Sequence, residues 1–172
     1  MRFRPSLFRL PALELGTGIK AIKFEEQYPT GLQGNPPNLD VVLELQDGHV
    51  IGVESKFSEW LTPKTKSHLP FKSKYFPDGA GLWEGLALPR TQQLAEALYT
   101  GDEVFRYLDA AQLLKHTLGM ATQLSGSFSL YYIYYDWPGA ESEVHTQEIA
   151  HFSQLVDDSL GFRALSYLDL FL

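Results

Sequence analysis

The stretch that decides the fold is NLDVVLELQDGHVIGVESKF, residues 38–57. Two apolar runs of strand length flank the pair Asp47-Gly48, a pattern that is typical of a β-hairpin. Charged residues interrupt both runs, Asp40 in the first and Glu54 and Lys56 in the second. Buried charge is costly unless it is paired, so the register of the hairpin is the first question to answer.

The length of the turn decides which side chains share a face, because a slip of one residue turns one strand over. A two-residue loop would place Asp40 opposite Ser55 and mix charged and apolar residues on both faces. A three-residue loop, with Gly48 in the left-handed conformation, would place Asp40 opposite Glu54. All the charges would then share one face, so this register is predicted. The other face would be apolar, with Leu39, Val41, Leu43, Leu45, Ile51, Val53 and Phe57.

Two carboxylates directly opposite each other destabilise a hairpin, and they do not both ionise cheaply without a positive charge nearby. A hard divalent cation such as Mg²⁺ would supply that charge, because it takes oxygen ligands from one or two carboxylates. Lys56 projects to the same face as Glu54, and Gly52 is expected to leave space beside the acids. The alternative is an edge hairpin whose polar face meets water, but the apolar strands favour a central position.

Composition limits the class of protein. With 172 residues, 44% of them hydrophobic, the chain suits one domain, residues 1–172, with a substantial core. The absence of cysteine excludes a disulfide framework and thiolate zinc sites, and it fits a cytoplasmic location. The net charge of −7 argues against a non-specific nucleic-acid coat protein, although five lysines gather in residues 56–75. Apolar runs are only strand-length, so no membrane association is expected.

Periodicity and turn residues predict a mixed α/β order of elements. The predicted elements are a strand at 19–26, the hairpin, a long loop at 62–90, a helix at about 102–124 capped by Asp102, a strand at 127–137, a helix at 145–159 and a last strand within 162–171. Tyr131, Tyr132, Tyr134 and Tyr135 are predicted core residues of the central strand, with base stacking as the alternative. His145, Glu148 and His151 do not share one tight helix face, so they are predicted to form a solvated helix edge.

The hairpin resembles the signature of the PD-(D/E)XK nuclease superfamily, which has the restriction-endonuclease-like fold. In that signature an Asp is followed, on the next strand of a hairpin, by Glu-X-Lys, and here 13 residues separate Asp40 from Glu54-Ser55-Lys56. Pro37 stands two residues further from the Asp than the family usually has it. The segment AQLLKH, residues 111–116, is similar to the glutamine-bearing helix of several branches, with Gln112 and His116 one turn apart.

The resemblance covers about residues 19–137, followed by a helix and strand in 145–170. It implies a mixed β-sheet flanked by helices, with a strand-strand-strand-helix-strand core. It also implies a metal-dependent nuclease that hydrolyses phosphodiester bonds, with DNA as the expected partner. The rival hypothesis is a noncatalytic nucleic-acid-binding or protein-interaction domain that retains the fold. A homodimer would give double-strand cuts in this family, although the sequence identifies no dimer surface.

The resemblance also implies roles for individual residues. The expected catalytic residues are Asp40, Glu54, Lys56 and Gln112. Mg²⁺ or Mn²⁺ would be held by Asp40, Glu54, the Ser55 carbonyl and an early acid, for which Glu26 is expected and Glu14 and Glu25 are alternatives. Expected substrate contacts are Lys64, Lys66, Lys72, Lys74 and His116. The lysines could instead only solvate the long loop, and His116 could be a buried structural histidine. Trp60, Trp83 and Phe71 could stack on bases or close the loop over the core.

Overall fold

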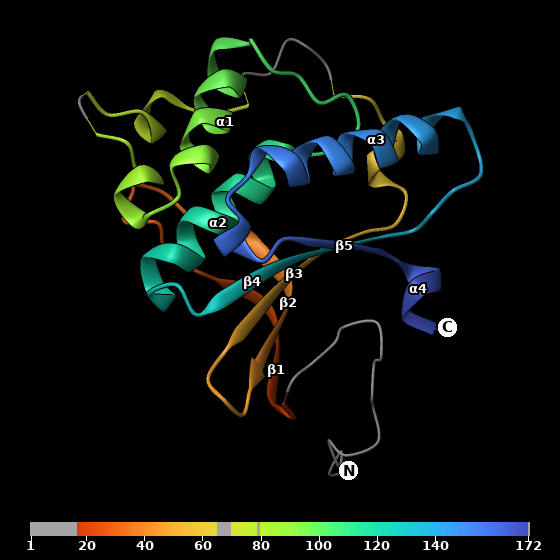
Figure 1. Cartoon of the computed structure of the whole chain (residues 1–172), viewed down its shortest axis with the longest axis horizontal. Helices are drawn as coiled ribbons and strands as arrows, with labels where there is room; N and C mark the ends of the chain where they lie inside the picture. The colour runs from red at the N-terminus through yellow and green to blue at the C-terminus, as the bar shows by residue number, and fades with distance from the viewer. Residues whose placement is uncertain (1–16, 65–69, 79, 172) are drawn as a thin grey trace.

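The computed structural model describes residues 17–64, 70–78 and 80–171 of the chain. Its centre is a mixed five-stranded sheet with the strand order β1-β2-β3-β4-β5 (Figure 1). β1, β2 and β3 are antiparallel neighbours, and β4 and β5 run parallel to β3 and to each other. The strands are β1 (Ile19–Gln27), β2 (Asn38–Leu45), β3 (Val50–Lys56), β4 (Phe128–Tyr134) and β5 (Arg163–Ser166). The predicted α/β class with a mixed sheet is confirmed.

Three longer helices lie together on one face of the sheet, and a short fourth helix lies by the C-terminus (Figure 1). They are α1 (Pro89–Thr100), α2 (Ala110–Leu124), α3 (Ala140–Leu155) and α4 (Tyr167–Phe171). Single 3-10 turns occur at Glu59–Leu61, Ser73–Tyr75, Glu84–Leu86 and Asp158–Leu160. Within the described ranges, no helix combines the length and the apolar character that a membrane crossing requires.

The β2–β3 hairpin has the predicted three-residue turn. Gly48 has a φ of +88°, and the Leu45 N–H donates to the His49 carbonyl at 2.9 Å. Val41 pairs with Val53 and Leu43 with Ile51, so the same register places Asp40 opposite Glu54, as predicted.

The hairpin is central in the sheet and covered on both faces, which excludes the alternative of an edge hairpin with a solvated polar face. The face that carries the charges is not solvated, because the larger core cluster, which includes Val42, Leu114 and Tyr132, lies between it and α2. The opposite face forms a smaller apolar cluster with Tyr131 and Ile133, against which Tyr167 and Leu170 of α4 pack. Both faces of the sheet are therefore core faces.

Leu39 and Gly52 correct two details of the predicted hairpin. Leu39 belongs to the cluster under α2 instead of the opposite apolar face, and the regular alternation fails where Glu25 of β1, opposite Asp40, has a φ of +53°. The space beside Gly52 is occupied, since a Cβ there would lie 2.6 Å from Met120 Sδ and 2.9 Å from Leu39 Cδ1. Gly52 therefore lets α2 approach the sheet and leaves no open space beside the acids.

The predicted helix at 102–124 is wrong at its start. The left-handed Gly101 ends α1, and the chain turns before the Asp109 carboxylate caps α2 by accepting from the Gln112 N–H at 3.1 Å. Asp102 accepts from the Thr100 hydroxyl instead of capping a helix. α1 begins at Pro89, within the end of the loop predicted at 62–90. α3 begins at Ala140 and not at the predicted residue 145. The last segment is the short strand β5 followed by α4.

Candidate active site

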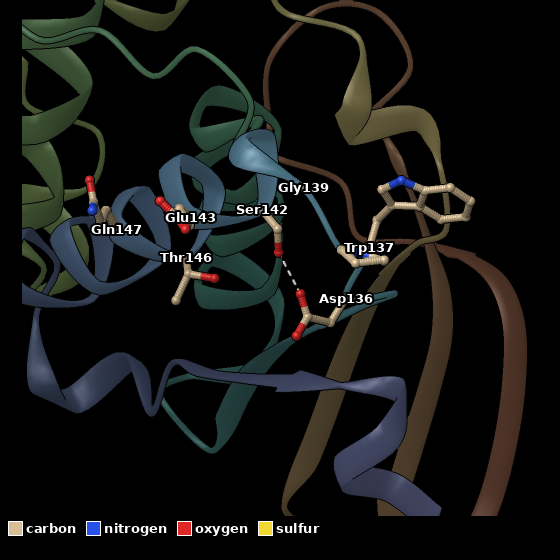
Figure 2. Close-up of a pocket in the computed structure, with 8 residues that line it drawn as sticks. Asp136, Trp137, Gly139, Ser142, Glu143, Thr146 and Gln147 are labelled. Carbon is tan, nitrogen blue, oxygen red and sulfur yellow. Dashed lines mark hydrogen bonds between the residues drawn. The ribbon is translucent and has the colours of Figure 1, made fainter.

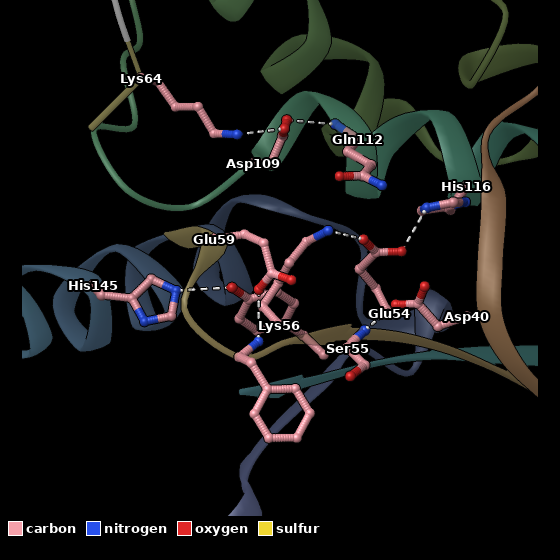
Figure 3. A network of polar contacts seen from close by, with 12 residues as sticks. Asp40, Glu54, Ser55, Lys56, Glu59, Lys64, Asp109, Gln112, His116 and His145 are labelled. Carbon is pink, nitrogen blue, oxygen red and sulfur yellow. Dashed lines mark hydrogen bonds and ion pairs between the residues drawn. The ribbon is translucent and has the colours of Figure 1, made fainter. Parts of the chain in front are cut away.

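The carboxylates of Asp40 and Glu54 meet on adjacent strands beneath α2 (Figure 3). The Ser55 N–H donates to Asp40 Oδ2 at 2.7 Å, which fixes the first carboxylate. Glu54 lies between a lysine from its own strand and a histidine from the helix. Lys56 Nζ is 2.5 Å from Glu54 Oε1, and His116 Nε2 is 3.0 Å from Oε2. The Glu54 side chain is only 2% exposed.

Glu54 is held by charge more than by hydrogen bonds. Although its two oxygens lie at ion-pair distance from nitrogen atoms, neither accepts a well-oriented hydrogen bond from any described residue. A buried carboxylate without such bonds loses free energy relative to water unless a further positive group approaches it. The site therefore has a shortage of positive charge, with the carboxyl groups of both Asp40 and Glu54 beside Lys56.

The pKa values of the neighbouring groups indicate the same shortage. Burial raises the pKa of Asp40, the Ser55 N–H partly offsets that effect, and the charge of Glu54 raises the pKa further. Burial alone would lower the pKa of Lys56, but its contact with Glu54 outweighs this, and the pKa is raised. Lys56 is therefore a cation at neutral pH, one positive charge beside two carboxyl groups.

The donor set suits a hard divalent cation. Asp40 and Glu54 offer carboxylate oxygens, and Ser55, the residue after Glu54 in β3, offers a backbone carbonyl oxygen. Among the described residues, no group of three or more His, Cys, Asp and Glu side chains could hold a metal ion. Mg²⁺ does not need such a cage, because it usually keeps several waters and takes one or two carboxylates.

The early acids differ in their relation to Asp40. The charge of Glu25 raises the pKa of Asp40, and Glu25 Oε2 accepts from Asn38 Nδ2 at 3.1 Å. Glu26 instead acts on Lys23 and Tyr28. Glu14 lies outside the described residues. Of the two described acids, Glu25 is the one whose charge acts on the site.

The two α2 residues singled out in the sequence occupy different environments. His116 is 3% exposed and touches Glu54, so it lies behind the carboxylate and not on an open surface. Gln112 is half-buried one turn earlier, on the same side of α2 (Figure 3). Its backbone N–H is used by the Asp109 cap, so its side-chain amide is the part that could meet a substrate.

The loop lysines are not gathered at the acids. Lys64 Nζ pairs with Asp109 at 2.8 Å, and Lys74 Nζ donates to the Gln33 carbonyl. Lys72 is exposed, and Lys66 lies outside the described residues. Lys64 reaches the Asp109 end of α2, the same helix that carries Gln112 and His116 (Figure 3).

The structure adds Tyr167, which the sequence did not single out, and it corrects the predicted surroundings of His145 and Glu148. The Tyr167 hydroxyl lies 2.5 Å from Ser55 Oγ, across 112 positions of the chain. His145 is fully buried, stacked on Trp60 with ring centroids 4.2 Å apart. Glu148 accepts the Tyr107 and Leu108 N–H groups at 2.9 and 2.8 Å. The predicted solvated edge is therefore wrong for His145 and Glu148, because the loop after α1 and the turn after β3 pack against α3.

The predicted burial of the tyrosines is confirmed within β4 and is wrong for the tyrosine just after it. Tyr131 and Tyr132 are buried core residues as predicted, whereas Tyr135 is 40% exposed. Trp60, Phe71 and Trp83 are all buried, so these rings close the loops over the core.

A mixed sheet whose antiparallel hairpin carries these acids and lysine beneath a covering helix defines a restriction-endonuclease-like protein. A family model described as "Restriction Endonuclease associating with ARP" (REase-ARP) matches residues 3–152. The chain belongs to this family. Comparisons with curated proteins and with solved structures gave no match.

Proposed function

We propose that the chain is a metal-dependent nuclease that hydrolyses phosphodiester bonds in DNA. The observation that carries this proposal is the buried Glu54, which lies opposite Asp40 and contacts Lys56 at 2.5 Å and His116 at 3.0 Å. The opposed Asp40 adds a second carboxylate with a raised pKa. A purely structural ion pair would not need that second acid.

In this proposal Asp40, Glu54 and the Ser55 carbonyl hold Mg²⁺ or Mn²⁺, and Glu25 is a better candidate than Glu26 for a further, outer contact. The chemistry that the cation supplies when bound is activation of water and neutralisation of charge on the phosphate. The Ser55 N–H keeps Asp40 oriented, and His116 supports Glu54 from the helix side.

Lys56 acts directly on the reacting groups in this proposal. Its raised pKa keeps it protonated, so it donates to the attacking water or to the phosphate oxygens and stabilises developing negative charge. Gln112 would orient water or a phosphate oxygen from α2. Lys64 and the exposed Lys72 would contact the backbone of the nucleic acid.

The family description also names a partner. We extend the association with ARP to this chain as part of the proposal, and co-purification of the full chain with its ARP would test that part separately.

The direct test is conversion of supercoiled plasmid to nicked or linear DNA with Mg²⁺ or Mn²⁺. Wild type should cut only with the metal, and Lys56→Ala should lose at least about 100-fold in rate, as expected for removing one charge-stabilising donor. Lys23→Ala is the matched control, because it breaks the Lys23–Glu44 pair on the same sheet, away from the acids, and should cut normally.

Lys56→Ala leaves Glu54 with one partner fewer, so its fold needs its own check by circular dichroism. Lys56→Arg keeps a cation beside Glu54 but changes its shape and donor geometry, so it should fold and still be strongly impaired. Equal cutting by wild type and both Lys56 variants would reject the proposal and indicate a contaminating nuclease.

A further inference from the structure

A row of aromatic rings crosses the carboxyl end of the sheet beside the candidate site. Phe57, Tyr135 and Trp137 follow directly after β3 and β4, and they are 57%, 40% and 49% exposed. The Phe57 ring stacks on Tyr167 at 4.5 Å and faces Tyr135 at 6.4 Å with a 17° angle between planes. The Tyr135 and Trp137 centroids are 6.0 Å apart. We call Phe57, Tyr135 and Trp137 the aromatic row.

The backbone ties the aromatic row to the residues of the proposed reaction. Phe57 follows Lys56 in sequence, and the Tyr135 N–H donates to the Lys56 carbonyl at 2.9 Å. The Glu59 carboxylate accepts from the Phe57 N–H at 2.8 Å, which fixes the turn after β3. Tyr167, behind Phe57, reaches Ser55 through its hydroxyl. The row therefore begins one residue from the lysine and has a fixed position relative to it.

The far end of the row borders a cavity. Trp137 forms one wall of an open cavity of about 580 Å³ between the end of β4 and the first turns of α3 (Figure 2). Polar side chains of Ser142, Thr146 and Gln147 line the opposite side. Asp136 and Glu143 also line it, and Asp136 Oδ1 accepts from the Ser142 hydroxyl.

We propose that the aromatic row binds unpaired nucleobases of the nucleic acid whose phosphate lies at Lys56, and that the cavity beside Trp137 receives a base at the end of the row. This inference rests on the proposed nuclease function and adds a substrate class, nucleic acid with a single-stranded stretch. Flat rings stack on aromatic side chains whatever the base, because every base has a π-face.

Charge favours bases over phosphates on this surface. The aromatic row has no positive charge of its own, and the carboxylates of Asp136, Glu143 and Glu59 would repel a phosphate placed on it. A neutral base avoids that repulsion, while the backbone stays on the Lys56 side. The rings from Tyr167 through Phe57 to Tyr135 are also near-parallel, with interplanar angles of 28° and 17°.

The test is binding of fluorescein-labelled 20-mers to the full chain in EDTA, where metal-dependent cutting cannot interfere. The probes are oligo(dT), oligo(rU) and a blunt duplex, each measured by anisotropy. Wild type should bind at least one of the two single-stranded probes more tightly than it binds the duplex probe. Trp137→Ala and Tyr135→Ala should each lose about 10-fold in single-strand affinity with duplex affinity unchanged, and Trp137→Phe should retain most of it. Phe24→Ala is the control, because Phe24 is an exposed ring on β1 that does not belong to the aromatic row, and this variant should bind as wild type does.

Each other outcome overturns the inference. Equal single-strand affinity in wild type and the Ala variants, or no single-strand preference in wild type, removes the row as a base-binding surface. If the variants instead change the oligomeric mass in light scattering and not the binding, the row is a protein interface. The plasmid assay decides the nuclease proposal separately, because Trp137→Ala should cut duplex plasmid as wild type does. Normal plasmid cutting by a protein that shows no effect of the row on single-strand binding would keep the nuclease and reject only the row.

Discussion

Glu54 makes one contact that follows from the sequence and one that does not. The hairpin register makes it the neighbour of Asp40, and this pairing follows from the sequence because only the three-residue turn separates charged from apolar side chains. Its contact with His116 did not follow, since it depends on how α2 lies over the sheet. The pairing of neighbouring strands can be predicted from a short stretch of sequence. The contact of Glu54 with His116, 62 positions away, depends on how the helix packs on the sheet.

His145 gives a prediction about pH. Burial lowers the pKa of His145 to about 4, and its Nε2 lies 2.9 Å from the Tyr132 hydroxyl. The unfolded chain binds a proton on this residue below about pH 6.5, whereas the folded chain stays neutral down to about pH 4. The free energy of unfolding therefore falls as the pH falls through this window, and His145 accounts for about 2 kcal/mol of that fall between pH 7 and pH 4.5.

Urea denaturation of wild type and His145→Phe at pH 7 and pH 4.5 measures this contribution. Phenylalanine keeps the stacking on Trp60 but cannot titrate, so the variant should lose less stability on acidification. Ser153→Ala is the matched control on the same helix, because Ser153 is exposed and does not titrate, so this variant should show the pH dependence of wild type. The same loss in wild type and His145→Phe would contradict the buried neutral state.

At the scale of elements, α2 is positioned by two glycines, one in the sheet and one in the helix. Gly52 admits Met120, and Gly119 lies so close to the loop after β1 that a Cβ would be 2.3 Å from the Tyr28 carbonyl oxygen. Periodicity predicted that a helix occupies this part of the chain, but it gave the wrong start, because the apolar spacing continues through the turn between α1 and α2. The Asp109 cap sets the boundary, whereas Asp102 was the cap predicted from the sequence.

Gly119→Ala should therefore destabilise the fold, although alanine favours helices. The clash is with a backbone atom that cannot rotate away, so the loss should reach about 3 kcal/mol, at the upper end of overpacking effects. Gly85→Ala is the control, since nothing lies within 4 Å of its Cβ position, and it should change stability by less than about 0.5 kcal/mol. Urea midpoints compare the two variants, and equal midpoints would mean that α2 lies further from the loop.

At the scale of the whole molecule, the mixed α/β class and the order of the strands along the chain were predictable from the pattern of strands and helices, together with the resemblance of the hairpin. The covering of the charged face was not, because strand periodicity reports which side chains share a face but not what packs on it. The same limit applies to Tyr167, which reaches Ser55 only after β5 has been added to the sheet.

Metal binding should stabilise the whole fold, because the opposed carboxylates exist as a pair only when β2 and β3 are joined. At a Mg²⁺ or Mn²⁺ concentration near 100 times the dissociation constant, the gain is about 2.7 kcal/mol, or roughly 5–10 °C in Tm for a chain of this size. Asp40→Asn should remove the shift. Asp47→Asn, in the turn of the same hairpin, should retain it, since Asp47 only accepts from the His49 N–H.

Thermal unfolding followed by circular dichroism, with and without the metal, gives this measurement independently of any cutting. The same shift in wild type and Asp40→Asn would place the cation elsewhere. No shift at all would favour a noncatalytic binding domain.

The left-handed backbone at Glu25 also has a consequence for assembly. β1 is an outer strand of the described sheet, and a long regular outer strand offers free N–H and C=O groups to another chain. The positive φ at Glu25 bends that edge near its end, and the exposed Lys20 and the ion-paired Lys23 add charge along it. The irregularity that brings an acid toward Asp40 therefore also protects β1 against edge-to-edge aggregation.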